Sequence, residues 1–221
     1  MKRAVLALLL ALAGQAALAD DVLSRRARAC TGCHGAEGRA AADGYHPRIA
    51  GKPAAYLHEQ LRAFRDGRRR YGLMTQLIEP LSDEYLGELA AHFAALELPY
   101  PPPQPDTADA AARERARILV TQGDPARRLP ACAACHGQAL MGVQPAVPAL
   151  LGLPRDYLVA QLGAWRTGTR VSRQPDCMAE IAKALGPDDI GALAGWLAAR
   201  PVPSPARPAA SLPKAMPLRC G

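Results

Sequence analysis

Cys30-Thr31-Gly32-Cys33-His34 is a pentapeptide that returns 102 residues later as Cys132-Ala133-Ala134-Cys135-His136. The two thiols of a C-x-x-C-H motif can form thioether bonds with the vinyl groups of one porphyrin, and the adjacent His can then ligate the iron. A single copy could also be half of a zinc site or a redox-active dithiol. Two copies in matching surroundings predict two covalently bound haems c, with His34 and His136 as the proximal ligands.

The composition favours helices around two small cores. The chain has 221 residues, enough for one large or two small domains, and aromatic residues make up 5% of it. Ala, Leu, Gly and Pro dominate, and no long run of β-branched residues indicates a sheet. A buried porphyrin in each half would supply the apolar volume that aromatic side chains do not. We therefore predict an all-α chain.

The first half predicts three helices separated by loops. A short Arg-rich helix over 22–29 leads into the first Cys, and the apolar residues behind Pro53 recur at helical spacing up to a stop at Gly67. A loop containing Met74 is expected next. Ser82 has the character of an N-cap, and the residues behind it form the apolar stripe of a further helix.

The second half repeats this order, which indicates a tandem duplication. A helix is expected over 113–122 before the second pentapeptide, and another begins at Pro187. Between them, six positions recur with an offset of 101 residues: Tyr56, Gln60, Leu61, Phe64, Arg65 and Gly67 match Tyr157, Gln161, Leu162, Trp165, Arg166 and Gly168.

Proline-rich stretches follow each unit and set the expected boundaries. So many prolines exclude helix and interior strand and favour a stiff, extended connection. The expected organisation is a signal peptide over 1–19, a first domain over 20–98, a linker over 99–106, a second domain over 107–200 and a tail over 201–221.

The first residues have the pattern of a secretory signal. Lys2 and Arg3 precede an apolar run that is too short for a bilayer span, and Ala17-Leu18-Ala19 fits a cleavage site. The alternative is an uncleaved N-terminal anchor. Because c-type haem is attached outside the cytoplasm, the expected location of the mature chain is the periplasm, either soluble or peripherally associated with a membrane.

The basic charge does not require nucleic acid. The formal net charge is +7, and without Lys2 and Arg3 the mature chain has 25 basic and 20 acidic residues. Two haems would add four propionates and bring the holoprotein near neutrality. No recognition motif is present either, so no nucleic-acid partner is expected. The densest basic run, Arg68-Arg69-Arg70, is either a solvated turn or a docking or propionate-contacting segment.

The ligand on the other side of each iron decides whether a haem binds small molecules or transfers electrons. Met74 lies 40 residues after His34 and Met178 lies 42 residues after His136, each before the last helix of its half. Met is most often a gap-filler in a core, but two that match in this way are predicted to be the distal ligands. The alternatives are His46, His58 and His92 for the first iron, and Met141, Met216 and Cys177 for the second.

His/Met ligation predicts one-electron transfer without bond-making on a substrate, because both axial positions are filled and a thioether favours ferrous iron. A ligating His usually donates its other ring N–H to a fixed acceptor. Pro47 and Pro148 follow the two His residues by 13 and 12 positions. Their backbone carbonyls could accept those bonds, or the prolines could serve only to shape turns.

The full order of motifs resembles the dihaem cytochromes c4. Each half has C-x-x-C-H, a Pro, Tyr-Leu-x-x-Gln-Leu, Gly-x-Arg and a Met before a final helix, and the similarity covers about 22–199. The resemblance implies two class I cytochrome c folds with haem propionates facing each other near the domain interface. It also implies a periplasmic electron carrier for terminal oxidases or other redox enzymes, and a carbonyl role for Pro47 and Pro148.

Two cysteines depart from the family pattern. Cys177 adjoins Met178 and Cys220 is the penultimate residue, and in an oxidising compartment two spare cysteines suggest a disulfide that pins the tail.

Related dihaem chains also serve as the cytochrome subunit of flavocytochrome sulfide dehydrogenases. The prediction is thus a non-enzymatic carrier whose partners are membrane oxidase or reductase complexes or periplasmic dehydrogenases. The alternatives are a bound dehydrogenase subunit and, if the Cys177 thiolate replaced Met178, a catalytic dihaem enzyme of the thiosulfate dehydrogenase or peroxidase type.

Overall fold

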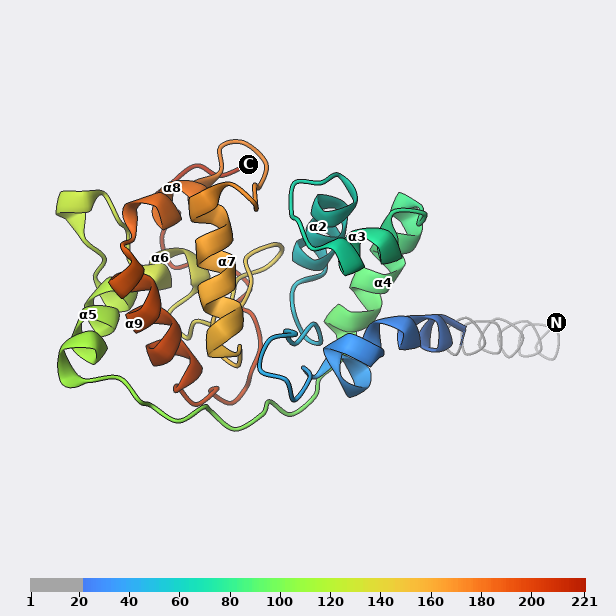
Figure 1. Ribbon diagram of the computed structural model, residues 1–221, viewed down its shortest axis with the longest axis horizontal. Helices are drawn as coiled ribbons and strands as arrows, with labels where there is room; N and C mark the ends of the chain where they lie inside the picture. Colours follow the sequence, from blue (N-terminus) through green and yellow to red (C-terminus); the bar gives the residue numbers. More distant parts are fainter. Residues whose placement is uncertain (1–21) are drawn as a thin grey trace, which may run out of the picture.

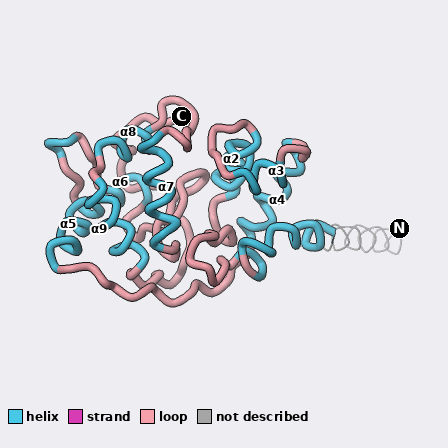
Figure 2. The backbone as a smooth tube through the Cα atoms, in the orientation of Figure 1, coloured by secondary structure: helices cyan, strands magenta, loops and turns pink. Residues whose placement is uncertain are grey.

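The computed structural model describes residues 22–221, so the expected signal segment over 1–19 lies outside the described residues. The described part consists of helices and loops without a strand, apart from isolated bridges (Figure 2). The all-α prediction is confirmed. Within residues 22–221, every helix is too short or too polar to span a lipid bilayer.

The chain folds into two lobes that follow each other in sequence (Figure 1). The first lobe contains a helix over 22–34, a 3-10 turn η1 (Ala36–Gly38), α2 (Ala54–Arg65), α3 (Gly72–Ile78) and α4 (Asp83–Ala95). The second contains α5 (Ala110–Thr121), η2 (Pro125–Arg127), α6 (Cys132–His136), α7 (Arg155–Thr167), α8 (Cys177–Ala184) and α9 (Pro187–Ala198). In the first lobe α2 packs on α4, and in the second α9 packs on both α5 and α7.

Local sequence explains where the long helices begin. The Ser82 hydroxyl accepts a hydrogen bond from the Tyr85 backbone N–H at 3.2 Å, which caps α4. Acidic residues in the first turn of α4 also suit the positive end of its dipole. In the second lobe Pro187 occupies the first turn of α9, and the Asp189 carboxylate accepts from the Gly186 backbone N–H at 3.0 Å. The inward faces of these helices form part of the cores of the two lobes, where Leu86 is fully buried and Leu193 nearly so.

The prediction of a loop around Met74 is wrong, because the structure places Met74 inside α3. This helix has only seven residues, too few for a helical period to stand out in the sequence. Tertiary contacts hold it in place. Ile78 is buried, and the Thr75 hydroxyl donates to the Phe64 carbonyl at 3.3 Å. Two other boundaries differ: the first helix continues to residue 34, and α5 begins three residues early because Asp109 caps it.

The proline-rich connection after α4 is packed against both lobes. Arg48 is almost fully buried and donates to the carbonyls of Leu98 and Pro99 at 2.6 and 2.9 Å, and its guanidinium lies 4.0 Å from the centre of the Tyr100 ring. Further along, the backbone N–H of Gln104 donates to the Ala198 carbonyl at the end of α9. The connection therefore fixes one lobe against the other.

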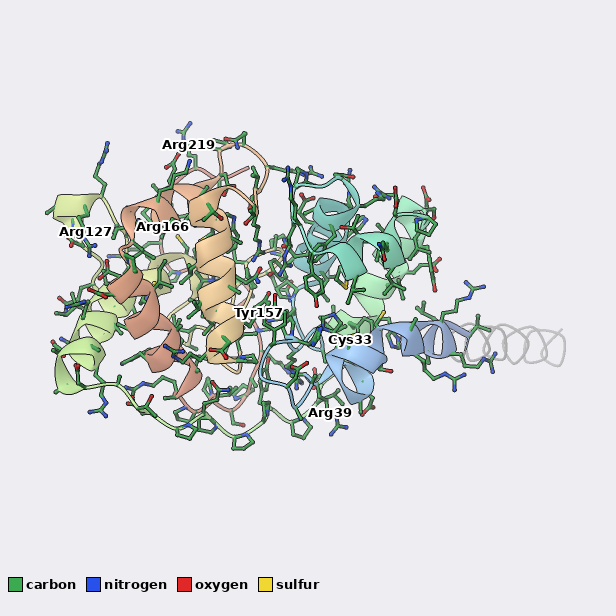
Figure 3. The ribbon with its side chains drawn as sticks, viewed as in Figure 1. Cys33, Arg39, Arg127, Tyr157, Arg166 and Arg219 are labelled. Atoms are coloured by element: carbon green, nitrogen blue, oxygen red, sulfur yellow. A yellow bond between two sulfur atoms is a disulfide. The ribbon has the colours of Figure 1, made fainter. Side chains whose placement is uncertain are left out.

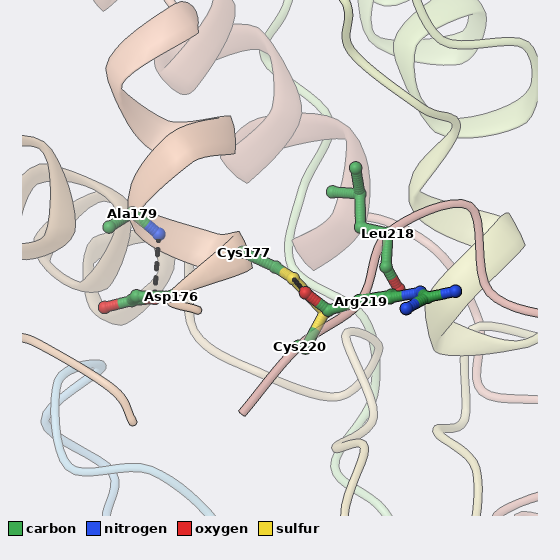
Figure 4. Close-up of a disulfide and its surroundings, with 6 residues drawn as sticks. All are labelled: Asp176, Cys177, Ala179, Leu218, Arg219 and Cys220. Atoms are coloured by element: carbon green, nitrogen blue, oxygen red, sulfur yellow. Dashed lines mark hydrogen bonds between the residues drawn. A yellow bond between two sulfur atoms is a disulfide. The ribbon is translucent and has the colours of Figure 1, made fainter. Parts of the chain in front are cut away.

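The tail after α9 runs back across the second lobe. Ala209 exchanges backbone hydrogen bonds with Gly142 and Gln144, and the chain ends where the Gly221 N–H donates to the Pro175 carbonyl at 3.0 Å. Beside that contact, Cys177 and Cys220 form a disulfide (Figure 4). The tail is thus tied to the first residue of α8.

Candidate haem sites

The first lobe contains a cavity of about 350 Å³ that holds the first pentapeptide. Cys30, Cys33 and His34 lie on its wall, and so does Met74. Much of the rest of the lining is apolar and comes from the first lobe, and residues of the second lobe such as Tyr157 and Gln161 also line the cavity. The apolar first-lobe residues are Leu57, Leu61, Phe64, Ile78, Leu81, Leu89 and Phe93. Two thiols, an imidazole, a thioether and an apolar wall are the set that a covalently attached haem requires.

Both histidines are oriented by a proline carbonyl. His34 Nδ1 lies 2.8 Å from the Pro47 carbonyl oxygen, and His136 Nδ1 lies 2.8 Å from that of Pro148. A carbonyl oxygen can only accept, so each Nδ1–H donates and the lone pair of Nε2 remains free for a metal. Burial lowers the pKa of both imidazoles, which favours the neutral form that can ligate iron.

The four motif thiols do not have the character of a redox dithiol. None of Cys30, Cys33, Cys132 and Cys135 forms a disulfide. Reactive C-x-x-C pairs have a lowered thiol pKa. Here burial raises the pKa of Cys30 and Cys135, and it raises that of Cys132 to about 11. The raised thiol pKa of Cys30, Cys132 and Cys135 disfavours a reactive dithiol and fits attachment points for a porphyrin, whereas Cys33 is exposed.

The three rival histidines of the first lobe have other partners. His46 lies on the cavity wall, but its Nδ1 contacts the Asp43 carboxylate and its Nε2 lies 3.5 Å from the Tyr71 hydroxyl. His58 Nε2 is 3.5 Å from an Asp83 carboxylate oxygen, and the His92 ring packs edge-on against Phe93. Neither His58 nor His92 belongs to the cavity lining. Met74 and His46 are thus the candidates that share the cavity with His34, and His46 is engaged by Asp43 and Tyr71, which leaves Met74 as the better candidate.

The second lobe has the corresponding groups. His136 is buried, and the half-buried Met178 is the second residue of α8, the helix equivalent to α3. Met141 is 2% exposed and belongs to the hydrophobic core of this lobe, whereas Met216 is exposed in the tail. The disulfide to Cys220 removes the thiol of Cys177, so that residue cannot supply a thiolate to iron.

The interface between the lobes contains an arginine from each half that reaches into the other. The Arg69 guanidinium donates to the Tyr157 hydroxyl at 3.0 Å and to the Gln161 side-chain oxygen at 2.7 Å. It also lies 4.5 Å from the centre of the Phe64 ring. Figure 3 shows Tyr157 on α7, the helix that faces the first lobe. Arg69 therefore joins the two lobes by its side chain.

Arg170 makes the mirror-image contacts. It donates to the Gln60 side-chain oxygen at 2.6 Å and reaches the Tyr56 hydroxyl at 3.5 Å, while its guanidinium lies 3.7 Å from the centre of the Trp165 ring. The backbones of Arg69 and Arg170 form an antiparallel bridge. Because the two arginines are 101 residues apart, the exchange follows the internal repeat.

These cations fit the propionates of bound haem. Arg69 and Arg170 are 9% and 3% exposed, and within residues 22–221 neither forms an ion pair with a carboxylate. Both line the cavity that holds the first pentapeptide. Buried charges are normally paired, and the propionates are the anions that haem brings. The sequence placed both arginines in the repeated Gly-x-Arg motif, but it indicated a possible propionate contact only for the basic run that contains Arg69.

Comparisons with known proteins agree with this geometry. The protein-family model described as cytochrome c matches residues 13–83. The chain is 38% identical to a thiosulfate dehydrogenase electron acceptor of Stutzerimonas stutzeri, over 88% of this chain and 91% of the relative. It is 34% identical to cytochrome c4 of Pseudomonas aeruginosa, over 87% of this chain and 94% of the relative.

Two solved structures have the same fold. Reduced recombinant cytochrome c4 from Pseudomonas stutzeri superposes with a TM-score of 0.70 at 27% identity, covering 81% of this chain and 97% of that one. Thiosulfate dehydrogenase from Marichromatium purpuratum superposes with a TM-score of 0.70 at 39% identity. In that case 78% of this chain matches 36% of the other, so the likeness is to one part of a longer protein.

Two haem-attachment motifs in a duplicated all-α fold define a dihaem c-type cytochrome, an electron-transfer protein with two covalently bound haems c. The chain belongs to the cytochrome c4 family. Its partners are therefore redox proteins.

Proposed function

We propose that this chain is a periplasmic carrier that accepts single electrons from a thiosulfate dehydrogenase and passes them on towards a terminal oxidase. The observation that carries the electron-transfer part is the placement of His34 and Met74 on one cavity wall. The two ligands would fill both axial positions of the first iron, and His136 and Met178 would do so for the second. Haem supplies the one-electron couple, and the protein supplies axial ligands and an apolar surround.

The donor is proposed from the relatives. An electron acceptor of thiosulfate dehydrogenase aligns with nearly the whole chain, and part of a thiosulfate dehydrogenase structure superposes on it. An acceptor of this kind needs a closed iron that thiosulfate cannot reach directly. Two His/Met haems would meet that requirement, because both axial positions of each iron would be filled.

Rapid mixing tests the proposal. The oxidised holoprotein is mixed with a thiosulfate dehydrogenase and thiosulfate, and haem reduction is followed by absorbance. We expect reduction that requires the enzyme and outpaces that of a monohaem cytochrome c of similar potential. Reduction by thiosulfate alone would contradict a closed iron, and a rate no faster than that of the control would contradict this donor.

Spectroscopy tests the ligands independently of the partner. Two His/Met haems show the near-infrared sulfur-to-iron band when ferric, and their ferrous form does not bind carbon monoxide. A high-spin or thiolate-type ferric spectrum would overturn the carrier proposal in favour of a catalytic dihaem enzyme. The bonded state of Cys177 argues against the thiolate form.

A bound subunit of a larger dehydrogenase is the second candidate. It is favoured by the match to a segment that covers 36% of a thiosulfate dehydrogenase chain. A carrier dissociates from the dehydrogenase after electron transfer, whereas a subunit stays bound to it. Purification from the native periplasm at physiological salt separates them, because a subunit would elute together with the dehydrogenase and a carrier would elute alone.

A further inference from the structure

The helix that carries the proposed distal methionine is anchored differently in the two lobes. In the first lobe the Thr75 hydroxyl, next to Met74, donates to the Phe64 carbonyl of α2 at 3.3 Å. The residue at the matching place in α8 is Ala179, which follows Met178 and has no hydroxyl to donate. The first turn of α8 therefore lacks the side-chain bond that ties α3 to its neighbouring helix.

A disulfide takes that place in the second lobe. Cys177 is the first residue of α8 and is bonded to Cys220 in the tail, and we call this bond the strap (Figure 4). The Asp176 carboxylate also holds the start of α8, but it accepts from backbone N–H groups only three and four residues away. The strap instead ties the residue before Met178 to a residue 43 positions away.

The strap also holds the end of the tail in place. Ala209 is fixed by backbone hydrogen bonds to the second lobe, and the Gly221 N–H donates to the Pro175 carbonyl beside the strap. Between these two points, residues 210–220 form no backbone–backbone hydrogen bond with any residue that the structure describes. Cleavage of the strap would therefore leave the end of the tail with one backbone hydrogen bond to the lobe.

The two sulfurs of the strap differ in their access to solvent. Cys177 is 8% exposed, and the Arg219 carbonyl oxygen lies 3.3 Å from its Sγ, whereas Cys220 is exposed. A sulfur nucleophile attacks the disulfide sulfur that it can reach, and the other sulfur leaves. Residues 208–221 contain Lys214 and Arg219 and no acidic side chain, which favours the approach of an anion. The expected attack is therefore that of an anionic nucleophile on Cys220.

We propose that the strap is a modification site for an inorganic sulfur nucleophile of the sulfite type, whose attack releases the tail and opens the distal side of the second haem. The sulfur of sulfite forms a bond with Cys220 Sγ, the S–S bond breaks, and Cys177 leaves as a thiolate. The products are one S-sulfonate and one thiolate, so no oxidant or reductant is consumed. Without the strap, the first turn of α8 loses its anchor and Met178 leaves the iron. The inference rests on the proposed ligation by Met178.

Carbon monoxide binding tests the proposal on the assembled holoprotein. The protein is first reduced with ascorbate, so that sulfite cannot change the oxidation state of the irons, and is then incubated with sulfite under carbon monoxide. We expect one haem per chain to bind carbon monoxide in the presence of sulfite and neither haem to bind it without sulfite. NMR should show loss of the upfield methyl signal of iron-bound Met178 and retention of that of Met74. Mass spectrometry after acid quenching should place one sulfonate on the peptide that contains Cys220.

Two variants separate the strap from the rest of the tail. The double variant Cys177→Ser, Cys220→Ser should bind carbon monoxide at one haem without sulfite and should not respond to sulfite. Met216→Leu is the matched control, because Met216 is exposed in the same tail and its replacement keeps the strap. It should respond to sulfite as the unsubstituted protein does. If the double variant does not attach haem, the sulfite experiment on the assembled holoprotein decides the question alone.

Three results would overturn the proposal: a strap that stays intact in excess sulfite, a sulfonate on Cys177, or cleavage without carbon monoxide binding at the second haem. Carbon monoxide binding at the second haem before sulfite is added would refute ligation by Met178, and with it the proposal that rests on that ligation. The two failures are therefore distinguishable. No dehydrogenase takes part in the measurement, so its result does not depend on which protein is the electron donor.

Discussion

The two lobes have one plan but differ beside Met74 and Met178, the proposed distal ligands. In the first lobe Leu73, which precedes Met74, is 64% exposed. In the second lobe the residue before Met178 is Cys177, which is 8% exposed and bonded to Cys220 at the end of the tail. The second lobe thus has a covalent strap, the Cys177–Cys220 disulfide, at the position where the first lobe presents an apolar side chain to the surface.

The comparison teaches that the two lobes share the groups around the haem motifs and differ outside them. The proline carbonyl, the proximal His and the interface arginine recur with equal geometry in both lobes. Lys52 and the Cys177–Cys220 strap have no counterpart in the other lobe. Two haems in near-identical frames can therefore be made inequivalent by a few local changes.

Replacing one distal ligand at a time should have the largest effect. Met74→His and Met178→His should each lower the potential of its own haem, by on the order of 0.1 V or more, because imidazole favours ferric iron relative to thioether. Redox titration of the holoprotein measures both waves. If both waves moved equally in either variant, the haems would not be separately ligated as we propose.

Removing the strap should destabilise one lobe only. The disulfide closes a separation of 43 residues, and its loss in the double variant Cys177→Ser, Cys220→Ser should cost about 2–4 kcal/mol of unfolding free energy. Denaturation followed by hydrogen exchange distinguishes the lobes. We expect lost protection in α8 and the tail with α2–α4 unchanged, and equal loss in both lobes would contradict a local strap.

The interface arginines should be equivalent. Arg69→Leu and Arg170→Leu each leave one Tyr hydroxyl without its arginine donor, while each Gln oxygen keeps a bond from the other arginine, so each variant should cost about 1–3 kcal/mol. Because the Gln60 and Gln161 oxygens lose both donors only when both arginines are replaced, the double variant should cost more than the sum. Chemical denaturation of the holoproteins measures this, and strict additivity would show that the two arginines act independently.

A surface ion pair across the same interface should matter least. Arg173 lies 2.9 Å from the Glu59 carboxylate but its side chain is 51% exposed. Exposed pairs contribute roughly 0–1 kcal/mol. Arg173→Ala is therefore the control for the arginine variants, and a loss as large as that of Arg69→Leu would mean that burial does not set the strength of interface contacts.

Haem attachment and the helical class could be predicted from the sequence because both depend on local patterns. In C-x-x-C-H the spacing along the chain alone brings the two thiols and the imidazole together. Ser82 marks the start of α4 because its hydroxyl accepts a hydrogen bond from the backbone N–H three residues later. The offset of 101–102 residues also revealed the repeat, and Met74 and Met178 could be paired because they follow His34 and His136 by 40 and 42 residues. The short helix around Met74 could not be predicted, because Phe64 and the core hold it rather than its own residues.

The sequence by itself determined two haem c attachments, their proximal histidines and a duplicated all-α chain, since these follow from contacts within a few residues or from repetition. Only the tertiary structure decided that the carbonyl oxygens of Pro47 and Pro148 orient the two histidines. It also decided that Arg69 and Arg170, 101 residues apart, pair at the interface between the lobes. It also decided that Lys52 is buried in the wall of a cavity to which both lobes contribute. Burial and partners of a charged side chain depend on what other segments bring beside it, and no local pattern in the chain encodes that.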